Sequence, residues 1–167
     1  MVCTPRILLC ALLVGFLLPE VTSRTLSWSG RTWSVRNSGL SGPGPNLWSD
    51  SAEQSFTDPG GNLLLILKET SNKWYCVEVF LDEALGYGTY EFNVAQDVSN
   101  LGAGDPHVVV GLFLYKDDQH ELDVEFARWG KAHSPINADY VNQPNTGSDK
   151  ALSWSQPALP ASSHRIE

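Results

Sequence analysis

Apolar and polar side chains alternate in short runs along most of the chain. In residues 86–95, for example, Tyr90, Phe92 and Val94 alternate with polar residues. This period of two is typical of β-strands that bury one face. Turn residues such as the Asp-Pro-Gly-Gly of 58–61 separate the runs. The pattern predicts strands at 31–36, 62–69, 74–81, 86–95, 107–115, 120–128 and 137–142, with 107–115 and 120–128 forming a hairpin.

Glycine and proline interrupt the alternation, and no segment of the expected domain shows the periodicity of an amphipathic helix. We expect loops at 38–46 and 102–106, where these residues are dense. Many short strands favour an all-β sandwich or barrel, which we place at residues 24–142. Residues 143–167 are rich in proline, serine, alanine and asparagine. They have little to bury, and we expect a disordered tail there.

The first residues have the pattern of a secretory signal peptide. Arg6 precedes an apolar run of 12 residues, which small residues follow. The run is too short for a membrane-spanning helix, which needs about 20 residues. We expect cleavage after Ser23, so that 1–23 is removed and the protein is secreted without a membrane segment. Cys76 is then the one remaining cysteine, which we expect to be buried, the alternative being a disulfide between two molecules.

Charge and composition narrow the choice of partners. The formal net charge of −8 argues against nucleic acid as a partner. Six tryptophans and five tyrosines exceed what a core of this size needs, and flat rings suit the apolar faces of sugars. No Cys/His spacing typical of a metal site occurs, and we expect neither a metal nor a cofactor. The sequence does not determine the oligomeric state.

The hexapeptide 121–126 (Glu-Leu-Asp-Val-Glu-Phe) is the most unusual of the alternating runs. On a strand it places Glu121, Asp123 and Glu125 on one face and three apolar side chains on the other. Packing needs only the apolar face. Because three like charges in a row repel one another, the acidic face calls for a functional reason.

Catalysis of glycoside hydrolysis is one such reason. Residues four apart on a strand have Cα atoms roughly 13 Å apart, whereas a retaining glycosidase brings two carboxyl groups to about 5–5.5 Å. Glu121 and Glu125 have long side chains that can lean toward each other. An exposed charged strand without function and a Ca²⁺ site are the alternatives. Acids in one line rarely surround a cation, which speaks against the second.

Two further segments upstream of the acidic strand add to the interpretation. They are 87–92 (Tyr-Gly-Thr-Tyr-Glu-Phe) and 58–63 (Asp-Pro-Gly-Gly-Asn-Leu). In this order the three segments resemble glycoside hydrolase family 16, the group of laminarinases, lichenases and xyloglucan transferases. The likeness covers roughly residues 31–142. Thr89 stands where the family usually has a basic residue.

The resemblance implies a concanavalin A-like jelly roll of two antiparallel sheets, with a sugar cleft on the concave one. It implies an enzyme that hydrolyses or transglycosylates a β-linked polysaccharide, with β-glucan as the first candidate substrate. Glu121 matches the nucleophile, Asp123 the assisting acid and Glu125 the acid/base. Glu91 matches a residue that faces the same cleft.

Three further residues are candidates for contact with a sugar. Trp129 follows the acidic strand, where its ring can stack on a sugar or pack over the end of the sheet. Trp48 and Asn46, in and beside the Gly/Pro-rich loop, are candidates for the rim of the cleft.

The resemblance also predicts that the domain is truncated. Domains of this kind run to about 200–250 residues, whereas this chain ends about 40 residues past the acids. Strands that complete both sheets would then be missing. A carbohydrate-binding module without catalysis and an inactive truncated relative are the alternative functions.

Overall fold

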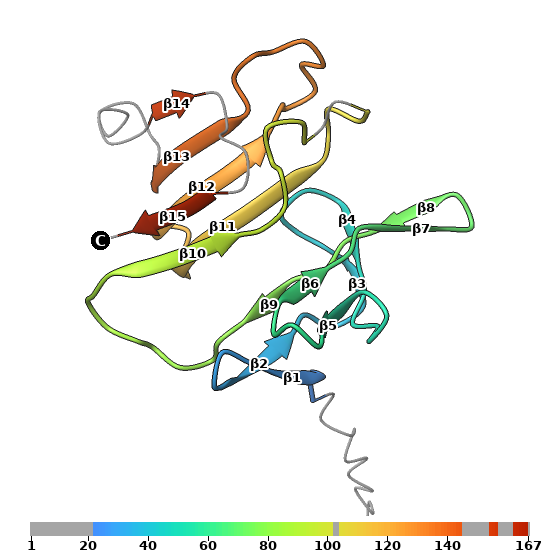
Figure 1. The fold of residues 1–167 in the computed structure, drawn as a ribbon. Coiled ribbons are helices and arrows are strands. Elements are labelled where there is room, and N and C mark those ends of the chain that lie inside the picture. Colours follow the sequence, from blue (N-terminus) through green and yellow to red (C-terminus); the bar gives the residue numbers. More distant parts are fainter. Residues whose placement is uncertain (1–21, 102–103, 145–153, 157–161, 167) are drawn as a thin grey trace, which may run out of the picture. The chain divides into compact units, whose positions relative to one another are not determined.

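The computed structural model describes residues 22–101, 104–144, 154–156 and 162–166. Within these ranges the chain forms β-strands and loops without a helix (Figure 1). The all-β prediction is thus confirmed for the described part, as several small antiparallel sheets. None of the described residues belongs to a helix that could cross a membrane. Of the predicted signal peptide at residues 1–23, residues 1–21 lie outside the described part of the chain.

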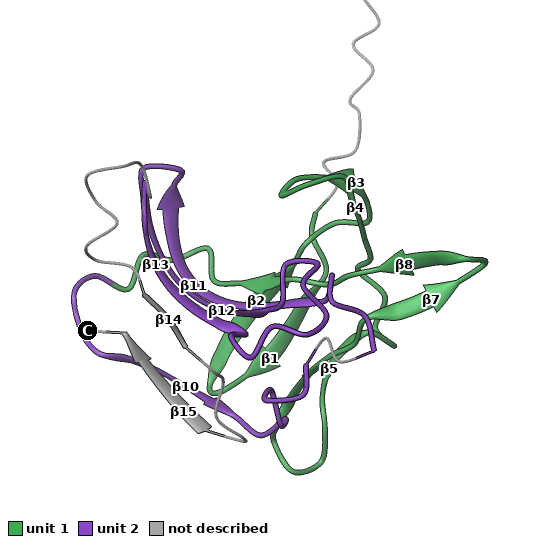
Figure 2. Cartoon of the chain, turned by 90° about the horizontal axis from the view of Figure 1, so that it is seen from above, with its two compact units in different colours: residues 1–85 green, residues 86–167 purple. Residues whose placement is uncertain are grey.

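The contacts within the chain form two compact units, residues 1–85 and 86–167 (Figure 2). The division falls inside the range 24–142 that the sequence predicts as one domain. Every described strand pair lies within one unit.

Unit 1 contains a three-stranded antiparallel sheet and three hairpins. In the sheet, β2 lies between β1 and β9. The hairpins pair β3 with β4, β5 with β6 and β7 with β8. The strands are β1 (Thr25–Trp28), β2 (Arg31–Val35), β3 (Gly39–Ser41), β4 (Asn46–Trp48), β5 (Ser55–Thr57), β6 (Leu63–Leu65), β7 (Lys68–Thr70), β8 (Lys73–Tyr75) and β9 (Val79–Phe80).

Two strands predicted as continuous are each broken in unit 1. Residues 62–69 form two strands, β6 and β7, because Gln54 hydrogen-bonds to the backbone between them. The Gln54 side-chain amide donates to the Ile66 carbonyl (3.0 Å), and the Ile66 N–H donates to the Gln54 carbonyl (2.8 Å). Residues 74–81 form β8 and β9, because the chain leaves the β7–β8 hairpin at Cys76. The backbone of Cys76 instead makes two hydrogen bonds of 2.9 Å, one with Leu47 of β4 and one with Ser49 just after β4. Alternation of side chains does not reveal where a strand changes its partner.

The predicted loop at 38–46 is also shorter than expected. Residues 42–45 form the turn, but Gly39–Ser41 pairs with Asn46–Trp48 as β3 and β4. These three-residue strands exclude the prolines and, apart from Gly39 at the start of β3, the glycines, so that the turn accommodates the rest.

Unit 2 contains a four-stranded antiparallel sheet, in the order β11-β12-β13-β14, and a ribbon of β10 and β15. The predicted hairpin at 107–115 and 120–128 and the strand at 137–142 are confirmed. The strands are β10 (Tyr90–Val94), β11 (Val109–Asp117), β12 (His120–Ala127), β13 (Ala138–Gln143), β14 (Trp154–Gln156) and β15 (Ser162–Ile166).

Two strands lie in the range 143–167, where the sequence predicts a disordered tail. β14 pairs with β13, and β15 pairs with β10, so the prediction is wrong for these two segments. The edges of β13 and β10 offer backbone N–H and C=O groups, which a polar segment can pair with as readily as an apolar one. The rest of the predicted tail after residue 144 lies outside the described residues.

The hydrophobic core of unit 2 lies on one face of the four-stranded sheet. At its centre are Val98, Val124, Phe126 and Ala138, all at most 1% exposed. Five partly buried residues pack against this centre, namely Val94, Leu101, Val110, Leu112 and Tyr140. The long strand β12 is thereby fixed from one side, which leaves its other side for the acids.

Candidate active site

The three acids of residues 121–126 lie on the face of β12 that turns away from the core. Val124 and Phe126 belong to the core cluster, and the acids alternate with them along the strand. Asp123 is 9% exposed, while Glu121 and Glu125 are half-buried. We call this side of the sheet the acid face. The separation of acidic and apolar side chains follows the period-two prediction.

The strands beside β12 add further residues to the acid face. β11 and β13 flank β12 on its two sides (Figure 1). Residues paired across antiparallel strands direct their side chains to the same face. The register places Tyr115 and Gln143 beside Glu121, Phe113 and Val141 beside Asp123, and Gly111 and Asp139 beside Glu125.

The carboxyl groups of Glu121 and Asp123 are hydrogen-bonded to each other. Burial raises the pKa of Glu121 to about 7, with the Asp123 charge and this hydrogen bond as further causes. Burial also raises the pKa of Asp123 to about 6, and the Glu125 charge adds to the rise. Hydrogen bonds from Glu121 and Gln143 act in the opposite direction on Asp123. Since an ionised carboxylate cannot donate, Glu121 is the protonated partner that donates to Asp123.

Glu125 has a different set of neighbours. Burial raises the pKa of its carboxyl, followed by the charge of Asp139 on β13 and then that of Glu121. The residue opposite on β11 is Gly111, which has no side chain. All three acids of the motif therefore have a raised pKa, as crowding on one face predicts.

Trp129 lies next to the acid face. Its indole Nε1 donates a hydrogen bond to Asp139 Oδ2 at 2.6 Å, and Asp139 is the strand partner of Glu125. Trp129 is 51% exposed, so half of its surface remains accessible to a ligand. The structure thus brings this sequence-predicted residue to the Glu125 end of the acidic strand.

Glu91 is not brought to the three acids. It lies on β10, where it alternates with Val94, and Val94 packs against the core of unit 2. Glu91 therefore lies on the face of the β10–β15 ribbon that turns away from the core. The three acids lie on a different surface, the face of the four-stranded sheet that turns away from the core. The Asn93 side chain donates to Glu91 Oε1 at 3.1 Å.

Asn46 and Trp48 belong to unit 1, whereas the acids belong to unit 2. The Asn46 amide donates to the Pro43 carbonyl (2.6 Å) and so closes the β3–β4 turn. Trp48 is buried, its Nε1 donates to the Ser41 carbonyl (3.2 Å), and the guanidinium carbon of Arg36 lies 4.2 Å from its ring centroid. These contacts give both residues structural roles in the hairpin.

Sequence reasoning missed two residues of β13, Asp139, which is paired with Glu125, and Gln143, which hydrogen-bonds to Asp123. The alternation of 137–142 could have identified Asp139, whereas Gln143 lies just beyond the predicted strand. To place these residues beside the acids, one must also know the register of β13 against β12, which the sequence pattern does not reveal. Among the described residues, no group of three or more His, Cys, Asp or Glu side chains could hold a metal ion.

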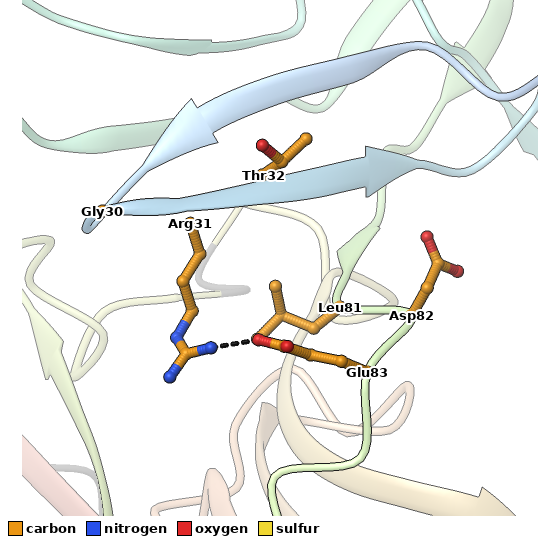
Figure 3. Close-up of a pocket in the computed structure, with 6 residues that line it drawn as sticks. All are labelled: Gly30, Arg31, Thr32, Leu81, Asp82 and Glu83. Atoms are coloured by element: carbon orange, nitrogen blue, oxygen red, sulfur yellow. Dashed lines mark hydrogen bonds and ion pairs between the residues drawn. The ribbon is translucent and has the colours of Figure 1, made fainter.

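A surface hollow of about 360 Å³ in unit 1 holds none of these residues (Figure 3). The side chain of Arg31 on its wall pairs with Glu83 in an exposed ion pair. Asp82 accepts a hydrogen bond from Ser34. The polar groups of the hollow are thus engaged with one another or with their neighbours, and we assign it no function. Its lining consists of Gly30, Arg31, Thr32, Leu81, Asp82 and Glu83.

Comparisons with protein-family models, curated proteins and solved structures found no match to the chain. The resemblance to glycoside hydrolase family 16 accordingly depends on the three sequence segments alone.

Proposed function

We propose that this protein is a secreted retaining glycosidase that acts on a β-linked polysaccharide, with β-glucan as the first candidate. One observation carries the proposal: Glu121, Asp123 and Glu125 share a partly buried face of β12 with raised pKa values, opposite the hydrophobic core. Stability gives no reason to gather three acids there, because their mutual repulsion opposes folding. A sandwich of the concanavalin A type belongs to the same proposal.

The acids divide the reaction between them. The ionised carboxylate of Glu121 attacks the anomeric carbon while Glu125 donates its proton to the glycosidic oxygen, so that the carbon–oxygen bond breaks and a glycosyl ester forms. Water then attacks the anomeric carbon, Glu125 accepts a proton from the water, and Glu121 is released as carboxylate. When Glu121 is ionised, its hydrogen bond with Asp123 requires that Asp123 carries the proton and donates it to the Glu121 carboxylate. Since the pKa of Glu121 is about 7, kcat/KM should rise with pH up to that value.

Substitution of the two glutamates tests the proposal. The parent should release reducing sugar from a soluble β-glucan. Glu121→Gln should reduce this activity below detection, and Glu125→Gln should reduce it at least about 100-fold, as expected for a general acid/base. Glu69→Gln is the matched control, because Glu69 lies exposed on β7 of unit 1 and carries the same charge. Full activity in Glu121→Gln would contradict the assignment.

A non-catalytic carbohydrate-binding protein is the second candidate. It is favoured by Phe113, Tyr115 and Trp129, which are 36%, 56% and 51% exposed, the first two on the acid face and the third next to it. Flat rings of this kind can stack on sugars without any chemistry. Binding of a β-glucan with no release of reducing sugar would favour this function over catalysis.

A further inference from the structure

The surroundings of Glu125 differ on its two sides. On the β11 side the paired residue is Gly111, which has no side chain, and the ring of Phe113 lies 3.7 Å from where a Cβ of Gly111 would stand. On the β13 side the paired residue is Asp139. Along β12 itself the nearest acid on the same face is Asp123, with Glu121 beyond it. Of the two residues paired with Glu125 on the neighbouring strands, only Asp139 is ionisable, and its side chain is a carboxyl group.

Asp139 is held in place by Trp129. The indole N–H can only donate, and its hydrogen bond to Asp139 Oδ2 is 2.6 Å long. Trp129 itself sits in a tight turn: its φ is +48°, that of Gly130 is +75°, and the Gly130 N–H donates to the Pro106 carbonyl at 2.9 Å. The turn after β12 thus fixes a carboxyl group beside Glu125.

We propose that Asp139, oriented by Trp129, is a positioning residue that favours the protonated form of Glu125 and so prepares it to donate to the glycosidic oxygen. The inference depends on the function proposed above. A neighbouring negative charge disfavours ionisation of a carboxyl, and Asp139 is the largest charge contribution to the raised pKa of Glu125, after burial. Glu121 contributes less, Asp123 lies between the two glutamates on the strand, and the charge of Asp118 acts on Glu121.

Removal and retention of the charge at position 139 test the inference. Asp139→Asn removes the charge but keeps an oxygen that can accept the indole hydrogen bond, whereas Asp139→Glu keeps the charge. Because Glu125 must be protonated for the acid step, activity is lost as pH rises through its pKa. In Asp139→Asn this high-pH limb of kcat/KM should move down by about one pH unit, and in Asp139→Glu it should stay within a few tenths of the parent. Glu69→Gln should leave the profile unchanged.

A titration that does not require activity separates this inference from the proposed function. The side-chain carboxyl ¹³C signal of Glu125, followed by NMR in the labelled protein, should titrate at lower pH in Asp139→Asn than in the parent. An unchanged Glu125 titration in Asp139→Asn would overturn the inference even if the enzyme is active. A lowered titration in a protein that releases no sugar would support the charge effect of Asp139 and contradict the proposed function. Should Asp139→Asn fail to fold, Asp139→Ser removes the same charge, and an unchanged Glu125 titration in that variant would likewise overturn the inference.

Discussion

The replacement of Glu121 by glutamine should make the folded protein more stable at alkaline pH. Burial and Asp123 raise the pKa of Glu121 from 4.5 to about 7. A group whose pKa is higher in the folded state favours folding at low pH, and this contribution is lost as pH rises through the folded value. The shift corresponds to at most about 3 kcal/mol. Because Glu121 is only half-buried and shares a proton with Asp123, solvent screening reduces our expectation to about 1–2 kcal/mol.

Glutamine suits this test because it keeps the shape of the side chain and its amide can still donate to Asp123. Urea unfolding, followed by tryptophan fluorescence and far-ultraviolet circular dichroism, gives the free energy of unfolding at pH 8 and pH 4. Glu121→Gln should exceed the parent by about 1–2 kcal/mol at pH 8 and match it at pH 4, where Glu121 is neutral in both states. The control Glu69→Gln should differ by less than about 0.5 kcal/mol at either pH.

Equal or lower stability of Glu121→Gln at pH 8 would refute the idea that the acid face is kept at a cost to folding. The same gain at both pH values would also refute it, because a packing effect does not depend on ionisation. The result expected here, a more stable and inactive variant, is the relation between stability and activity that functional sites commonly show.

Two further predictions concern residues with structural roles, Phe126, which is fully buried, and Cys76, which the sequence predicts to be buried and which is only partly so. Phe126→Ala should lower the free energy of unfolding by about 3–5 kcal/mol, because Phe126 is fully buried in the core of unit 2. The control Val109→Ala, at a position that is 43% exposed, should lower it by less than about 1 kcal/mol in the same urea titrations. Equal losses in the two variants would contradict the placement of the core. Cys76 should resist iodoacetamide in the native protein, because burial raises the pKa of its thiol and the thiol donates to the Leu47 carbonyl at 3.1 Å. Peptide mapping by mass spectrometry should find the label on Cys76 only after unfolding. Rapid labelling of the native protein would contradict this prediction.

The sequence predicted the central hairpin well because its information is local. Residues 107–115 and 120–128 carry long alternating runs joined by four polar residues, and they form β11 and β12 almost as expected. The same alternation separates Glu121 from Val124 correctly. Period-two patterns of this length leave few other ways to bury one face.

Pairing with distant segments was not predictable in the same way. The strand predicted at 62–69 breaks because Gln54 bonds its main chain, and nothing within 62–69 signals this contact. The pairing of β14 and β15 uses backbone groups, which every residue has, so that composition misled the prediction of the tail. Asp139 was missed for a related reason: its place beside Glu125 follows from the register of β13 against β12.

Covalent trapping of the intermediate tests the central claim most directly. The protein is incubated with an activated 2-deoxy-2-fluoro β-glucosyl donor, which slows release of the glycosyl ester, and its peptides are then mapped by mass spectrometry. The proposed mechanism predicts a single sugar adduct on Glu121, formed by the parent and the Glu69→Gln control and lost in Glu121→Gln. No adduct at any donor concentration, or an adduct on a residue outside the acid face, would contradict it.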